Sequence, residues 1–160
     1  MSLKILAGAL ALSALLGAAP AFAADELNVV PGLSIAGAPL AVHGYDPVAY
    51  FTEGKPMRGS DSLVHVHDGA AYRFANAEHL AMFEADPAKY LPQYGGFCAY
   101  GVSVGKKFDG DPNFWKVADG RLYLNLNEEI SDTFNKDVAG AIEKADRNWT
   151  DIRGKAAGEL

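Results

Sequence analysis

The stretch that decides the fold is Leu-Val-His-Val-His-Asp-Gly-Ala-Ala-Tyr-Arg-Phe, residues 63–74. Alternation of side-chain type before the Asp68-Gly69 dipeptide is typical of a half-buried strand, and Asp-Gly favours a two-residue turn. The pattern predicts a β-hairpin. Its register pairs residues equidistant from the turn: His65 with Tyr72 and Leu63 with Phe74.

A similar arrangement occurs twice along the chain. Asn76 is a helix-capping residue type and predicts a helix over residues 76–86. Further along, residues 115–124 form a second strand–turn–strand pattern around Asp119-Gly120, and Asn127 caps the helix that follows. This similarity has two explanations. One is an internal duplication, and the other is that any hairpin leading into a helix requires a turn dipeptide and a capping residue at such positions. We favour the second explanation.

The carboxy-terminal part carries the clearest helical periodicity. From Ile130 to Ile152, apolar residues recur at steps of three and four, which predicts an amphipathic helix that Gly140 kinks or splits. Together these patterns predict an α+β fold in which a small antiparallel sheet of short hairpins packs against two or more helices.

The amino terminus has the three parts of a cleavable signal peptide. A positive start at Lys4 precedes an apolar run over residues 5–19 and the small-x-small site at residues 21–23. A membrane anchor fits less well, because glycine, serine and proline interrupt the run and no basic flank follows it. We expect residues 1–23 to be removed, and the protein to work in the periplasm without membrane insertion.

Composition narrows the class of protein further. The net charge of −6 becomes −7 once Lys4 is removed, and such an acidic chain is a poor nucleic-acid binder. We expect a lead-in at residues 24–39, one domain at 40–153 and a flexible tail at 154–160. The motifs of phosphate-binding loops, serine hydrolases, zinc proteases and dithiol oxidoreductases are absent, which disfavours an enzyme.

The sequence contains a single cysteine, Cys98, in the glycine-rich stretch 93–110. An exported protein normally pairs its cysteines, and this one has no partner in the chain. Its thiol is therefore either buried and inert, or used for metal, redox or intermolecular chemistry. The Lys106-Lys107 pair in the same stretch is expected to be solvated.

Several strings in a fixed order identify a resemblance. They are Gly-Tyr-Asp-Pro-Val-Ala-Tyr-Phe at 44–51, Gly-Ala-Ala-Tyr-Arg-Phe at 69–74, Asp-Pro-Ala-Lys-Tyr at 86–90, Pro-Gln-Tyr-Gly-Gly-Phe-Cys-Ala at 92–99 and Leu-Tyr-Leu-Asn at 122–125. This order resembles the YHS domain, a small module often linked to heavy-metal handling, and in particular its exported stand-alone branch. The resemblance covers about residues 40–150.

The departures limit what the resemblance implies. Where the metal-associated family pattern has three cysteines, this chain has Ala49, Ala75 and His79, so a thiolate cage at those positions is excluded. The stand-alone branch is described as including selenoproteins whose selenium residue matches Cys98, which implies reactive chemistry at that position in those relatives.

Candidate ligands for a metal ion are Cys98, His65, His67 and His79. The two strand histidines are two positions apart, so their rings project from one face, which otherwise looks like core. His79 occupies a family ligand position, although the helix pattern places it on the exposed side. Residues expected to support a pocket around the thiol are Tyr45, Asp46, Tyr94, Gly95 and Gly96.

Three functions stay open on the sequence alone. The leading hypothesis is a module that binds a soft transition metal such as copper or zinc through Cys98 with histidine help. The second is a single-thiol redox protein in which Cys98 reacts with peroxide or with a thiol partner protein. The third is a non-catalytic interaction module with an inert cysteine.

Overall fold

The structure is a computed structural model that describes residues 25–160. The predicted signal peptide, residues 1–23, lies outside this range. Within it, no helix is both long enough and apolar enough to cross a membrane.

The strands are short. They are β1 Val29–Val30, β2 Leu40–Ala41, β3 Ser60–His67, β4 Ala70–Phe74, β5 Asp111–Ala118 and β6 Arg121–Asn125. The α-helices are α1 Ala49–Thr52, α2 Ala77–Ala85, α3 Pro87–Tyr90, α4 Ala99–Ser103, α5 Glu128–Lys136 and α6 Val138–Ile152. Three 3-10 turns complete the fold: η1 Val42–Gly44, η2 Gln93–Gly96 and η3 Ala157–Glu159.

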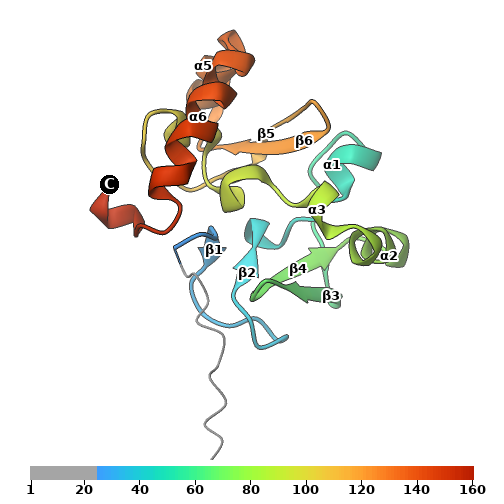
Figure 1. The fold of residues 1–160 in the computed structure, drawn as a ribbon. Coiled ribbons are helices and arrows are strands. Elements are labelled where there is room, and N and C mark those ends of the chain that lie inside the picture. The colour runs from blue at the N-terminus through green and yellow to red at the C-terminus, as the bar shows by residue number, and fades with distance from the viewer. Residues whose placement is uncertain (1–24) are drawn as a thin grey trace, which may run out of the picture.

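The α+β class is confirmed, with the two hairpins in separate sheets. β3 and β4 belong to a four-stranded sheet of order β1-β2-β4-β3, and β5 pairs only with β6. The larger sheet is mixed, because β2 runs parallel to β4. Figure 1 shows the segment from α3 to α4 running between the two hairpins, with α6 beside the second one. β1 belongs to the predicted lead-in, which therefore contributes to the sheet.

Both predicted hairpin turns are present. Asp68 and Gly69 have φ of 46° and 81°, and Asp119 and Gly120 have φ of 49° and 72°. Two successive positive φ values define the turn whose twist matches that of the flanking strands, and Asp-Gly adopts it readily.

The register of the first hairpin is only partly as predicted. His65 faces Tyr72, but Phe74 faces Ser60 rather than Leu63, because the register shifts between Ser60 and Val64. A bulge adds residues to one strand only, so counting from the turn fails beyond it.

The helix caps follow the sequence. The side chain of Asn76 accepts a hydrogen bond from the backbone N–H of His79, and Asn127 does the same for Ile130. The carboxy-terminal stripe is two helices, and the break lies at Asp137 rather than Gly140. The Asp137 side chain accepts the N–H of Gly140, so it caps α6 as a new helix.

The second half of the fold repeats the first. The elements β3, β4 and α2 have the same lengths as β5, β6 and α5, which begin 51 positions later. Both hairpins shift register after their outermost residue pair. His43 and Tyr94, also 51 positions apart, both adopt positive φ, at 49° and 55°. The apolar core consists of two clusters: one contains Phe83 together with Leu122 and Leu124 of β6, and the other contains Tyr123.

Lys107 corrects one expectation. Lys106 is exposed, but Lys107 is buried, and its Nζ donates to the backbone carbonyls of Asp25, Arg153 and Lys155. Burial lowers the pKa of this lysine. Its ammonium group joins the first described residues to the segment predicted as a flexible tail.

Candidate functional site

Cys98 lies at the start of α4 and is fully buried. A parallel bridge to Leu124 holds it beside β6, and its backbone N–H donates to the carbonyl of Phe108 at 2.9 Å. Gly95, Gly101 and Gly110 lie in close-packed backbone rather than in an open loop, whereas a Cβ on Gly105 would meet no atom within 4 Å. A Cβ on Gly110, for example, would lie 2.2 Å from the carbonyl oxygen of Gly96.

The surroundings of Cys98 favour the neutral thiol. Burial raises the pKa of the Cys98 thiol, and hydrogen bonds from the backbone N–H groups of Gly101, Leu126 and Tyr100 offset only part of this rise. The Sγ atom donates to Oδ1 of Asn125 at a long 3.8 Å and accepts the N–H of Gly101 at 3.3 Å. A buried thiol with a raised pKa is a weak nucleophile and a weak metal ligand at neutral pH.

His65 and His67 project from the same face of β3, as predicted. Their ring centroids are 6.3 Å apart, and both rings pack edge-on against Phe83. His65 is 3.3 Å from a carboxylate oxygen of Glu84, and His67 is 3.4 Å from that of Asp68. These contacts describe two half-buried histidines that cover an aromatic core.

His79 is buried, so its placement on the exposed side of α2 was wrong. Its Nδ1 donates to Oδ2 of Asp46 at 2.6 Å, and its Nε2 lies 3.1 Å from Oγ1 of Thr52. The carboxylate of Asp46 also accepts the backbone N–H groups of Val48 and Ala75, at 2.8 Å each. The Asp46–His79 pair therefore joins α1, α2 and the end of β4. The Asp46 carboxylate and the His79 ring already have hydrogen-bond partners within the protein.

The residues expected to support a pocket around the Cys98 thiol make contacts elsewhere in the fold. Asp46 bonds the groups just described and none on Cys98. Tyr94 is buried, and its hydroxyl donates to a carboxylate oxygen of Asp146 at 2.8 Å. Gly95 lies against the backbone of Glu26, where a Cβ would be 1.8 Å from the carbonyl oxygen.

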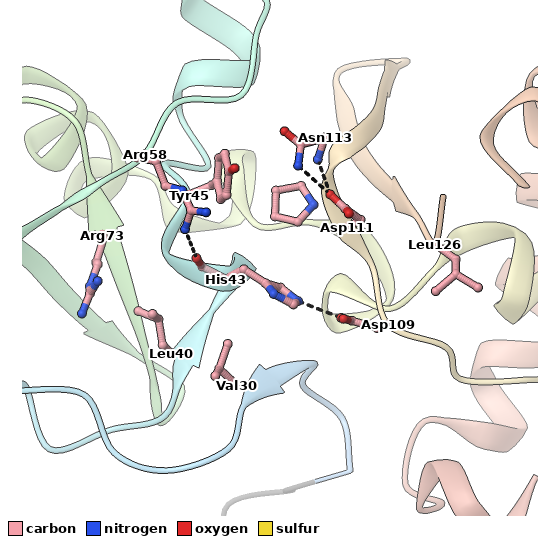
Figure 2. Close-up of a pocket in the computed structure, with 11 residues that line it drawn as sticks. Val30, Leu40, His43, Tyr45, Arg58, Arg73, Asp109, Asp111, Asn113 and Leu126 are labelled. Carbon is pink, nitrogen blue, oxygen red and sulfur yellow. Dashed lines mark hydrogen bonds and ion pairs between the residues drawn. The ribbon is translucent and has the colours of Figure 1, made fainter. Parts of the chain in front are cut away.

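A pocket of about 420 Å³ lies where the two halves meet (Figure 2). We call it the junction pocket. One wall comes from the first half of the fold, and the other comes from Asp109, the start of β5 and the residue after β6. Its lining residues are Val30, Leu40, His43, Tyr45, Arg58, Arg73, Asp109, Asp111, Pro112, Asn113 and Leu126.

A hydrogen-bond network fixes one side of the junction pocket. Oδ1 of Asp109 accepts from Nδ2 of Asn28 at 2.7 Å and pairs with Nε2 of His43 at 2.8 Å. Burial alone would raise the pKa of Asp109, but these two hydrogen bonds and the N–H of Gly110 bring it below its ordinary value. Asp109 is therefore a stable carboxylate that ties the amino-terminal segment and η1 to the loop before β5.

Arg58 stands on the opposite side. A bridge between Tyr45 and Arg58 places the two residues side by side, and the guanidinium carbon lies 4.3 Å from the Tyr45 ring centroid. Its NH1 atom donates to the carbonyl of His43 at 3.3 Å. Stacking and hydrogen bonding hold the guanidinium at the pocket with most of its five N–H donors still available.

The four predicted metal ligands do not come together. Among residues 25–160, no three His, Cys, Asp or Glu side chains are arranged to hold a metal ion. Among the pocket-lining residues, the sequence predicted a site role only for Tyr45, because the others come from segments far apart in the chain. No motif spacing marks such a site.

Comparisons with protein-family models, with curated proteins and with solved structures find no match to this chain.

Proposed function

We propose that this protein is a non-catalytic binding module that holds a small polar molecule in the junction pocket. The observation that carries the proposal is the pocket itself, whose 420 Å³ is within the usual range of about 300–1,000 Å³ for small-ligand sites. Its wall combines aliphatic side chains with more charged and polar groups than the predominantly apolar wall of most such sites, which favours a polar ligand.

The state of Cys98 supports this reading over the metal and redox alternatives. Both need an accessible thiolate, whereas the sulfur is fully buried, its pKa is raised, and its hydrogen-bond partners are an amide and backbone groups. We therefore assign Cys98 a structural role beside β6. Binding of copper or zinc stays a prediction that rests on the sequence resemblance to the YHS domain.

The cellular place of the module follows from the signal-peptide prediction. Cleavage of residues 1–23 would release the module into the periplasm, where a pocket for a small polar molecule suits uptake, storage or sensing.

A thermal-unfolding screen tests the proposal. The mature protein is heated with amino acids, dicarboxylates, polyamines, sugars and, separately, Cu(I) or Zn²⁺. A true ligand at ten times its Kd stabilises the folded state by about 1.4 kcal/mol and raises Tm by several degrees.

A pocket-filling variant shows whether the effect comes from the junction pocket. Val30→Trp adds an indole to the pocket wall, and Val104→Trp adds the same group at a position that is 54% exposed elsewhere. The ligand should stabilise the wild type and Val104→Trp and leave Val30→Trp unchanged. Equal stabilisation of all three, or stabilisation by metal ions alone, would overturn the proposal.

A further inference from the structure

We infer that the ligand of the junction pocket is a small zwitterion with an aliphatic body, held by its anionic end at Arg58 and by its cationic end at Asp111. This inference rests on the proposed function and adds the chemical class of the ligand. Its basis is the balance of charges in the pocket.

Most charged groups that line the pocket already have partners. His43 pairs with Asp109 at 2.8 Å, and Arg73 pairs with Asp61, outside the pocket, at 2.5 Å. Two groups of opposite sign are left. In the part of the chain that the structure describes, neither Arg58 nor Asp111 forms an ion pair.

Each of these two groups is held in place by uncharged partners. Arg58 stacks on Tyr45 and donates to a backbone carbonyl, and Oδ1 of Asp111 accepts the backbone N–H and the Nδ2 of Asn113 at 2.8 and 2.9 Å. Figure 2 shows Arg58 with Tyr45 on one side of the pocket and Asp111 with Asn113 on the other. The arrangement fixes a positive and a negative site that face one cavity.

This pair of sites discriminates among ligand charges. A purely anionic ligand would pair with Arg58 but approach Asp111 and Asp109, and a purely cationic ligand would pair with Asp111 but approach Arg58. Either one leaves a like charge close by, which weakens binding. A molecule with one charge of each sign satisfies both sites and has no net charge.

The remaining wall defines the body of the ligand. Val30, Leu40, Pro112 and Leu126 present aliphatic groups to the same cavity. Burial of each methylene group against them tightens binding by roughly fourfold, so a carbon chain or branched side chain between the two charges is favoured over a sugar-like body.

The test compares zwitterions with their single-charge analogues by titration calorimetry. The probes are leucine, 4-aminobutanoate, 5-aminopentanoate and 6-aminohexanoate, with hexanoate and hexylammonium as the analogues. We expect at least one zwitterion to bind at least ten-fold more tightly than both analogues, and Val30→Trp to abolish this binding.

Charge variants then assign the two ends. Arg58→Gln and Asp111→Asn should each weaken that zwitterion at least ten-fold, and Arg58→Lys, which keeps the charge without the planar fork, should weaken it less. Arg147→Gln removes a charge that is 61% exposed on α6 and should leave the Kd unchanged. Circular dichroism and Tm of the free variants establish that each is folded.

The outcomes separate the two levels of the proposal. If a single-charge probe, or any other compound of the screen, binds in the pocket as tightly as the best zwitterion, the zwitterion inference is wrong and the proposed function stands. The same holds if the Arg58 and Asp111 variants bind within threefold of the wild type. If no probe binds at millimolar concentration, both are wrong.

Discussion

Replacing Asp46 by alanine should destabilise the protein more than almost any other single change of a polar residue. Its carboxylate is fully buried and accepts three hydrogen bonds, from the N–H groups of Val48 and Ala75 and from Nδ1 of His79. Alanine accepts none of them. The backbone N–H of Val48 and the buried imidazole of His79 would then lie in a cavity without a partner.

The magnitude follows from these contacts. An orphaned buried donor costs about 1–3 kcal/mol, and Asp46→Ala orphans three donors. Water reaches the half-buried Ala75 more easily than the other two donors, so we expect a loss of about 3–5 kcal/mol rather than the sum of three full penalties. Asp46→Asn keeps one acceptor oxygen and the shape of the side chain, and should lose about 2 kcal/mol.

Urea unfolding followed by tryptophan fluorescence measures these losses. Asp132→Ala, which removes an exposed carboxylate from α5, is the matched control and should stay within about 0.5 kcal/mol of the wild type. If Asp46→Ala is within about 1 kcal/mol of the wild type at an unchanged m-value, the buried pair does not hold α1 to α2, and our reading of this site is wrong.

Three further measurements address the hairpins, the core and the thiol. Gly120→Val should lower the free energy of unfolding in urea by about 1–2 kcal/mol, because φ at this glycine is 72°. A Cβ there meets no atom within 4 Å, so the loss measures backbone strain alone, and Gly120→Asn should lose less. Phe134→Ala should cost about 3–5 kcal/mol, whereas Phe108→Ala, at a 46% exposed ring, should cost far less. Cys98 should react with iodoacetamide far more slowly in the folded protein than after denaturation, and added Cu(I) or Zn²⁺ should not alter the native rate. Fast native labelling would restore the metal and redox alternatives. Because burial raises the pKa of this thiol, its contribution to stability is full below about pH 8.5 and is lost as the pH rises above that, and Cys98→Ala should lack this dependence.

The fold class could be predicted because its signals are local. Asp-Gly fixes the turns and asparagine fixes the starts of α2 and α5, and each acts through backbone groups within a few residues. The bulge in β3 and the helix break at Asp137 could not be read in the same way. Asp137 leaves the helical region, with φ and ψ of −150° and 71°, but in the sequence it resembles an ordinary helix-surface residue.

The candidate site could not be predicted because its contacts join distant segments. His79 has the sequence context of an exposed helix residue, and only its contact with Asp46, 33 residues away, explains its burial. Asp109 of the junction pocket is hydrogen-bonded to Asn28, which is 81 residues away in the sequence. Cys98 attracted attention as an unpaired thiol in an exported chain, but packing beside β6 decides its chemistry.

The repeated architecture bears on both the origin of the fold and its pocket. A hairpin that leads into a helix needs Asp-Gly and a capping asparagine, but it does not need the same bulge, the same element lengths and the same left-handed residue before the hairpin. These shared features favour internal duplication over the explanation that the sequence patterns alone support.

Two identical halves would give their junction two-fold symmetric charges. Arg58 and Asp109 are 51 positions apart, line the same pocket and carry opposite charges. Asp111, the proposed negative site, likewise corresponds to the neutral Ser60, 51 positions earlier. Divergence at these two positions thus gave the junction a positive site at Arg58 and a negative site at Asp111, which is the asymmetry that a zwitterion requires.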